Sequence, residues 1–335
     1  MLIRSQPARL TFLLAAMVVM VAASASAQVP DVVIVGERLC SITCPTPLYQ
    51  VEWFGPTYGH RIGPNVFKVV ESAPGGRLYA LLTGSPSRVV EVLPDGSYTP
   101  LTAPLAGFRL IDLTVARNGA FYVLASQGNA SPGRILAFDP SGNLVATRNA
   151  SVGTQDYYRL DLAADQCTLF YTDFSLTTIR RINVCSGAPL PDLATLPGEV
   201  RDLRVLPDGG VLVVDVDRGL VRLNAAGVET RTYPLGQVYP YAAIALIDNG
   251  ATALYGGDHY DSSGTVLGRL DLNSGVATTL TGTASEGRTF SVAARLGWTA
   301  AIGASSHGGA DVPTLSTWAM LIAVAALGVL ALRRL

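Results

Sequence analysis

The sequence predicts an all-β fold assembled from repeated hairpins. Its 34 glycines and 20 prolines lie dispersed among short runs of Val, Leu, Ile and Tyr, as is typical of strands joined by tight turns. A strand–turn–strand pattern recurs six times along the chain, and a second hairpin follows the first five copies. Because two hairpins make a four-stranded unit, these observations predict a six-bladed β-propeller over residues 28–303.

The repeats align on their first turns. Successive turns are 43, 47, 43, 41 and 47 residues apart, at Gly76, Gly119, Gln166, Gly209, Gly250 and Gly297. The second hairpins turn at residues 94–96, 140–142, 186–187, 226–227 and 273–275, and each of these turns contains a glycine. A spacing in the forties with four strands is propeller spacing, and seven blades are the main alternative to six.

The sixth repeat lacks its second hairpin. Strand-like segments at residues 32–35 and 48–54 precede the first repeat and have no other assignment. We expect them to close the last blade, since joining the chain ends removes exposed sheet edges. In this layout the chain resembles propellers of the NHL and SMP-30 types.

The N-terminus has the composition of a secretory signal peptide. Arg4 and Arg9 supply a basic start, residues 10–23 are apolar, and Ala25-Ser26-Ala27 is a small-residue cleavage site. We predict a signal peptide over residues 1–27. An uncleaved anchor helix is the alternative.

The C-terminus has the composition of a transmembrane helix. Residues 315–332 carry no charge and are followed at once by Arg333 and Arg334, which should stay on the cytoplasmic side. With a cleaved signal peptide, the propeller would face the periplasm. Residues 304–311 are small and polar and form a predicted flexible spacer.

A short motif precedes the apolar segment. It consists of Val312, Pro313, Thr314, Leu315 and, three residues later, Trp318. Together with the helix and the terminal arginines, it resembles the IPTL-CTERM sorting signal, with Val312 in place of Ile. The resemblance covers residues 312–335 and implies recognition by an exosortase-like enzyme and transfer to the cell surface or beyond. An ordinary tail anchor is the alternative.

Four cysteines in an exported chain predict disulfides. Cys167 and Cys185 flank a hairpin with strands at residues 168–172 and 179–184, which brings the two cysteines opposite each other. The surrounding segments also resemble a cysteine-paired blade of secreted bacterial propellers. Cys40 and Cys44 are the two cysteines that remain, and we expect them to pair with each other by elimination. A zinc site is not expected there, because no second Cys or His pair follows at zinc spacing.

Charged residues occupy equivalent places in three repeats. Asp112, Arg159 and Asp202 each lie seven residues before the aligned turn residue, at the start of the predicted innermost strand. Such a cluster at the mouth of a central channel is a candidate site for a cation or a polar ligand. The alternative is a set of solvated or mutually paired side chains.

The composition narrows the classes of function. The formal net charge is −1 with no basic patch, so nucleic acid is not an expected partner. No nucleophile–His–acid arrangement or phosphate loop is present, and we predict no catalytic residues, no metal site and no cofactor, with calcium as the one candidate ion. We expect a surface module that binds a protein, glycan or matrix polymer. The alternative is a metal-dependent hydrolase, as the SMP-30 resemblance implies.

Overall fold

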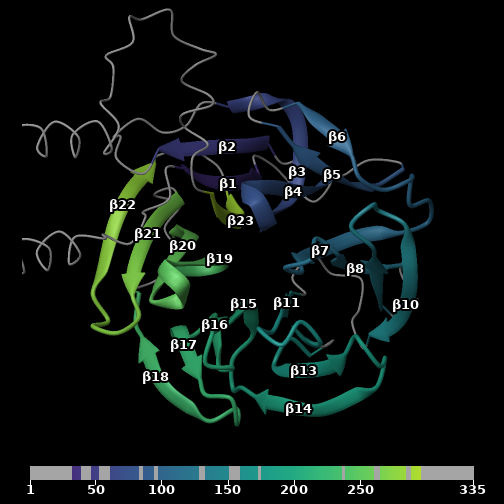
Figure 1. Cartoon of the computed structure of the whole chain (residues 1–335). Coiled ribbons are helices and arrows are strands. Elements are labelled where there is room, and N and C mark those ends of the chain that lie inside the picture. The colour runs from purple at the N-terminus through teal and green to yellow at the C-terminus, as the bar shows by residue number, and fades with distance from the viewer. Residues whose placement is uncertain are drawn as a thin grey trace, which may run out of the picture. The chain divides into compact units, whose positions relative to one another are not determined.

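The computed structural model describes eleven segments of the chain, residues 32–38, 47–52, 61–82, 86–93, 97–127, 133–150, 159–172, 175–235, 238–259, 265–283 and 288–295. The chain divides into two compact units, Met1–Ile302 and Gly303–Leu335, and all described residues lie in the first. In that unit antiparallel sheets follow one another around a ring, which is the predicted propeller arrangement (Figure 1).

Four of the sheets have four strands each, and they correspond to the second to fifth repeats. Each is a meander whose first strand lies nearest the centre of the ring (Figure 1). The strands are β7 (Arg109–Val115), β8 (Phe121–Ser126), β9 (Gly133–Phe138) and β10 (Leu144–Ala150); β11 (Leu160–Leu162), β12 (Thr168–Thr172), β13 (Thr178–Asn183) and β14 (Pro189–Thr195); β15 (Val200–Val205), β16 (Val211–Asp215), β17 (Gly219–Leu223) and β18 (Glu229–Tyr233); and β19 (Val238–Ile247), β20 (Thr252–His259), β21 (Thr265–Asp271) and β22 (Ala277–Thr283).

The remaining strands form a single seven-stranded sheet in the order β23-β1-β2-β3-β4-β5-β6. Its strands are β1 (Val32–Arg38), β2 (Pro47–Glu52), β3 (Arg61–Ala73), β4 (Arg77–Leu82), β5 (Arg88–Val92), β6 (Tyr98–Pro100) and β23 (Arg288–Arg295). Strand β1 pairs with β23, with Val32 opposite Arg295, so the N-terminal strands lie beside the last described strand.

The prediction of six separate blades is therefore wrong, because the described strands form five sheets. The reason lies in the length of β3, which has 13 residues. Its N-terminal part pairs with β2, with Tyr49 opposite Arg61, and its C-terminal part pairs with β4, from Phe67 to Ala73. One strand thus joins the closing strands to the sheet of the first repeat.

Apolar side chains of adjacent sheets share their cores. Tyr79 of β4 packs edge-on against Phe121 of β8 with 5.7 Å between ring centroids, and Phe121 stacks on Phe138 of β9 at 4.9 Å. Three further clusters of buried residues likewise span neighbouring sheets. Each sheet therefore buries its faces against its neighbours, which is why such units are stable only as a ring.

The turns of the second hairpins fit against the preceding sheet at the outer rim. Gly142 adopts φ +81° in the β9–β10 turn, and a side chain there would overlap the Leu101 carbonyl. Gly227, with φ +80° in the β17–β18 turn, would overlap the Leu193 carbonyl in the same way. Glycine is needed at both places because of the left-handed backbone and the close approach of the neighbouring chain.

Several predicted features lie outside the described residues. They include the signal peptide over residues 1–27, Cys40 and Cys44, the spacer at 304–311 and the sorting motif with its helix at 315–332. Within the described segments, no helix is long and apolar enough to cross a membrane.

Candidate functional site

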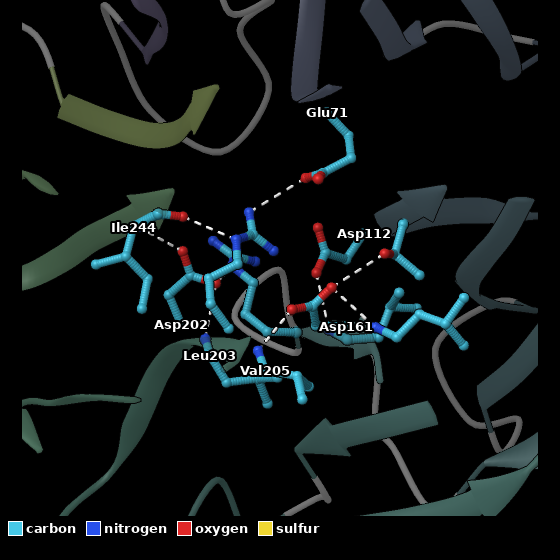
Figure 2. A network of polar contacts seen from close by, with 12 residues as sticks. Glu71, Asp112, Asp161, Asp202, Leu203, Val205 and Ile244 are labelled. Carbon is cyan, nitrogen blue, oxygen red and sulfur yellow. Dashed lines mark hydrogen bonds and ion pairs between the residues drawn. The ribbon is translucent and has the colours of Figure 1, made fainter. Parts of the chain in front are cut away.

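Six charged side chains meet where the innermost strands approach the centre of the ring. We call them the axial network: Glu71 of β3, Asp112 of β7, Arg159 just before β11, Asp161 of β11, and Asp202 and Arg204 of β15. Asp112, Arg159 and Asp202 lie seven residues before the aligned turn, and Glu71, Asp161 and Arg204 lie five residues before it. Because side chains two apart on a strand share one face, both positions lie on the same strand face. Figure 2 shows this convergence.

Each of three aspartates forms a hydrogen bond from its own sheet to the following sheet. Asp112 accepts a hydrogen bond from the backbone N–H of Leu160 at 2.8 Å. Asp161 accepts one from Val205 at 2.7 Å, and Asp202 accepts one from Ile244 at 2.7 Å (Figure 2). Each acceptor is on one sheet and each donor on the following sheet. These carboxylates therefore hold the inner ends of four sheets in register.

The two arginines lie among these carboxylates. Arg159 Nε is 3.7 Å from Asp202 Oδ1. Arg204 donates from Nε to the Ile244 carbonyl at 2.8 Å, and its Nη2 is 3.3 Å from Glu71 Oε2. Asp202 and Arg204 thus bind the N–H and the C=O of the same residue, Ile244, on the next sheet.

Burial changes the protonation of the acidic groups. It raises the pKa of Glu71 to about 8, although Arg204 opposes this shift. Burial also raises the pKa of Asp112 to about 6, against the attraction of Arg159 and Arg204. The pKa of Asp161 is raised for the same reason, and Arg204 again opposes the shift. Near neutral pH the Glu71 carboxyl is therefore mostly protonated, while Asp112 is mostly ionised.

The sequence-predicted residues Asp112, Arg159 and Asp202 all lie in this network. They are paired rather than solvated, since only 2%, 6% and 1% of their surfaces are exposed. Binding of a ligand there stays a prediction.

Sequence reasoning missed Glu71, Asp161 and Arg204. A sequence signal was present: Asp161 and Arg204 lie two residues after Arg159 and Asp202 and so on the same strand face, and Glu71 is at the equivalent place in the first repeat. Glu71 and Asp161 are also the partly exposed members of the network, whereas the three predicted residues are buried.

The arrangement of acidic groups does not resemble a metal centre. Within the described segments, no three His, Cys, Asp or Glu side chains are grouped so that they could hold a metal ion. Asp112, Asp161 and Asp202 each direct an oxygen at a backbone N–H group instead, and Glu71 faces Arg204. We therefore do not assign calcium to the axial network.

A second polar feature lies at the outer rim. An open pocket of about 410 Å³ is lined by residues of the fourth and fifth repeats, namely Asp208, Arg222, Asn224, Thr230, Arg231, Leu272 and Asn273. Its cations are already engaged, because Arg222 bonds Asp208 at 2.6 Å and Arg231 donates to the Asn273 carbonyl at 2.6 Å. The Arg222 contact lies within one sheet, and the Arg231 contact joins this sheet to the next.

The predicted disulfide between Cys167 and Cys185 is confirmed. The two Cα atoms are 5.2 Å apart, and the bond closes a loop with a sequence separation of 18 residues. Strands β12 and β13 pair inside this loop, with Thr168 opposite Asn183. The cross-link therefore fixes the central hairpin of one sheet.

Comparison with known proteins supports the fold alone. No protein-family model matches the chain, and no curated protein matches it. Among solved structures, a protein of unknown function from Bacteroides caccae is similar over 79% of this chain and 99% of its own, with a TM-score of 0.62 and 14% identity. TolB from Acinetobacter baumannii is similar over 82% of this chain and 69% of its own, with a TM-score of 0.63 and 12% identity. A chain of a nidogen/laminin complex is similar over 79% of this chain and 98% of its own, with a TM-score of 0.56 and 14% identity.

Proposed function

We propose that this protein is an exported, surface-attached β-propeller that acts as a binding module for a protein or a glycan of the extracellular matrix. The observation that carries the proposal is the use of the axial carboxylates. Asp112, Asp161 and Asp202 each accept a backbone N–H from the next sheet, so they stabilise the ring. A general acid or base needs a carboxyl that reaches a substrate, whereas each of these three carboxylates already accepts a hydrogen bond from backbone.

A ring fixed in this way is a rigid platform. Rigid surfaces bind with a small loss of conformational entropy, which favours recognition by a preformed face. The nidogen/laminin complex is a case in which a chain of similar fold occurs in an assembly of two proteins. Fold similarity does not transfer function, and it serves here only as a precedent.

Export and surface attachment rest on the terminal sequences. The predicted signal peptide at residues 1–27 and the sorting signal at 312–335 bracket the propeller. The Cys167–Cys185 disulfide supports export, because disulfides persist in oxidising compartments and are rare in the bacterial cytosol. The exosortase-like enzyme would act on the motif after translocation, and the final location would be the cell surface or the extracellular matrix.

Binding is tested with the full-length chain in detergent micelles. We expect it to bind a glycan array or whole cells, and to show no lactone hydrolysis with or without added calcium. Calcium-dependent lactone turnover would instead favour the hydrolase alternative. A chain that binds neither glycans, cells nor matrix protein would contradict the proposal.

Sorting is tested by fractionation of cells that express Pro313→Ala or Trp318→Ala. We expect both variants to remain unprocessed in the inner membrane, since they change the motif itself. Thr317→Ser is the matched control, because it changes a position that the motif leaves variable. Wild-type processing and location in both motif variants would refute the sorting claim.

A further inference from the structure

The axial network contains a buried donor that the described residues do not satisfy. Arg204 is 7% exposed, and its Nε and Nη2 face the Ile244 carbonyl and the Glu71 carboxyl. Its third nitrogen, Nη1, is buried without a hydrogen-bond partner among the described residues. Because burying an unpaired donor of a charged group is unfavourable, this nitrogen indicates an acceptor that comes from outside the chain.

Solvent reaches the network at Glu71, the carboxyl that pairs with Arg204. The Glu71 side chain is 18% exposed, compared with 8% for Arg204 and 2% for Asp202. Asp161 is also only partly buried. An entering group would therefore meet the carboxyl of Glu71 before the Arg204 side chain.

The charges around Arg204 restrict the chemistry of that group. Four acidic side chains surround two arginines, and Glu71, Asp202, Asp161 and Asp112 all act electrostatically on Arg204. An anion would add negative charge beside these carboxyls, and a cation would face two buried guanidinium groups. An uncharged oxygen that both accepts and donates a hydrogen bond fits both kinds of neighbour, and a hydroxyl group has this property.

We propose that the axial network binds an uncharged, hydroxyl-bearing ligand, a neutral saccharide, through a hydroxyl oxygen that accepts from Arg204 Nη1 and donates to the carboxyl of Glu71. The inference names the ligand class and the contact site of the proposed binding function, and so it rests on that function. The hydroxyl completes the hydrogen bonding of Arg204 without a change in net charge. Glu71 then acts as the acceptor on the solvent side.

The test uses the full-length chain in detergent micelles with neutral and acidic oligosaccharides on one array. Neutral ligands found there are titrated by calorimetry against Arg204→Gln and Glu71→Gln. We expect Arg204→Gln to weaken binding about tenfold or more, because it removes a charged donor. Glu71→Gln should weaken binding less. This variant keeps the size of the side chain, and it decides the question if Arg204→Gln fails to fold by circular dichroism.

Two control variants locate the binding. Arg180→Gln changes an exposed pair with Asp192 and should bind as wild type. Arg222→Gln changes the rim pocket, and a loss confined to this variant would place the ligand there and overturn the inference. Neutral saccharides that bind Arg204→Gln and Glu71→Gln as tightly as wild type would also overturn it, while the binding function would stand.

The remaining outcomes separate the two proposals. Binding of acidic saccharides or of phosphate alone, lost in Arg204→Gln, would make the network an anion site and overturn the uncharged class. Binding of matrix proteins but of no saccharide would overturn the inference and keep the binding function. A chain that binds no saccharide, cell or protein would overturn both.

Discussion

The sheets contact their neighbours through different interactions at their inner ends and at their outer rim. At the axis, a charged group on one sheet binds backbone on the next, as Asp112 does with the N–H of Leu160. At the rim, glycine turns lie against backbone of the preceding sheet, as Gly142 does beside Leu101. The inner contacts depend on the protonation state of the acidic side chains, whereas the rim contacts depend on the close fit of glycine turns against backbone. The two regions should therefore respond differently to substitution and to pH.

The largest effect is expected at the rim. Gly142→Ala and Gly227→Ala combine a left-handed backbone with overlap of a neighbouring carbonyl, and each should lower the free energy of unfolding by more than about 4 kcal/mol. Urea denaturation measures the change. Gly107→Ala is the matched control, because it shares the left-handed backbone, with φ +79°, but its added methyl meets no atom within 4 Å, and about 1–2 kcal/mol is expected. Equal losses at all three sites would contradict a fit between backbones.

A nearly equal effect is expected at the axis. Asp202→Ala removes the acceptor for the Ile244 N–H and leaves Arg159 without this carboxylate, so we expect a loss of about 3–5 kcal/mol. Asp192→Ala removes an exposed partner of Arg180 and should change stability by less than about 1 kcal/mol. Thermal and urea unfolding of both variants make the comparison. Similar small losses would show that the axial carboxylates do not hold the sheets together.

The disulfide lies within one sheet, so it contributes neither to the axial contacts nor to the rim contacts between sheets. Replacing both cysteines with serine should lower the free energy of unfolding by about 3 kcal/mol, since the closed loop spans 18 residues. The wild-type chain under reducing conditions should match the double variant. If reduction has no effect on the wild type, the cross-link does not contribute to stability.

The effect most specific to the axis is the pH dependence. The folded-state pKa of Glu71 is about 8 and that of Asp112 about 6, both above their ordinary values of 4.5 and 3.8. The folded chain therefore holds more protons than the unfolded chain between about pH 4 and pH 8, and stability should fall as pH rises through this window.

Urea midpoints at pH 5, 6.5 and 8 measure this decline. Glu71→Gln cannot ionise and should flatten the upper part of the curve, above about pH 6.5, where Asp112 is already ionised. Gly275→Ala lies at the rim and should leave the slope as in wild type. A slope that persists unchanged in Glu71→Gln would show that Glu71 is not the group that titrates.

The local units of this protein can be read from neighbouring residues in its sequence. The turns, the paired strands of the second to fifth repeats and the Cys167–Cys185 bond all follow from nearby residues, because glycine turns and strand alternation act within one hairpin. The sequence also marked Asp112, Arg159 and Asp202 as equivalent inner positions.

How the units join depends on contacts between residues that are distant in the chain. β3 pairs with β2 as well as β4, which merged the closing strands into one seven-stranded sheet, and no local pattern specifies such a shared strand. The axial partners lie far apart in the chain, as Asp161 and Val205 do across 44 residues. A charged side chain on an inner strand has the same sequence pattern whether it faces water or a neighbouring backbone, and closure of the ring determines which of the two it meets.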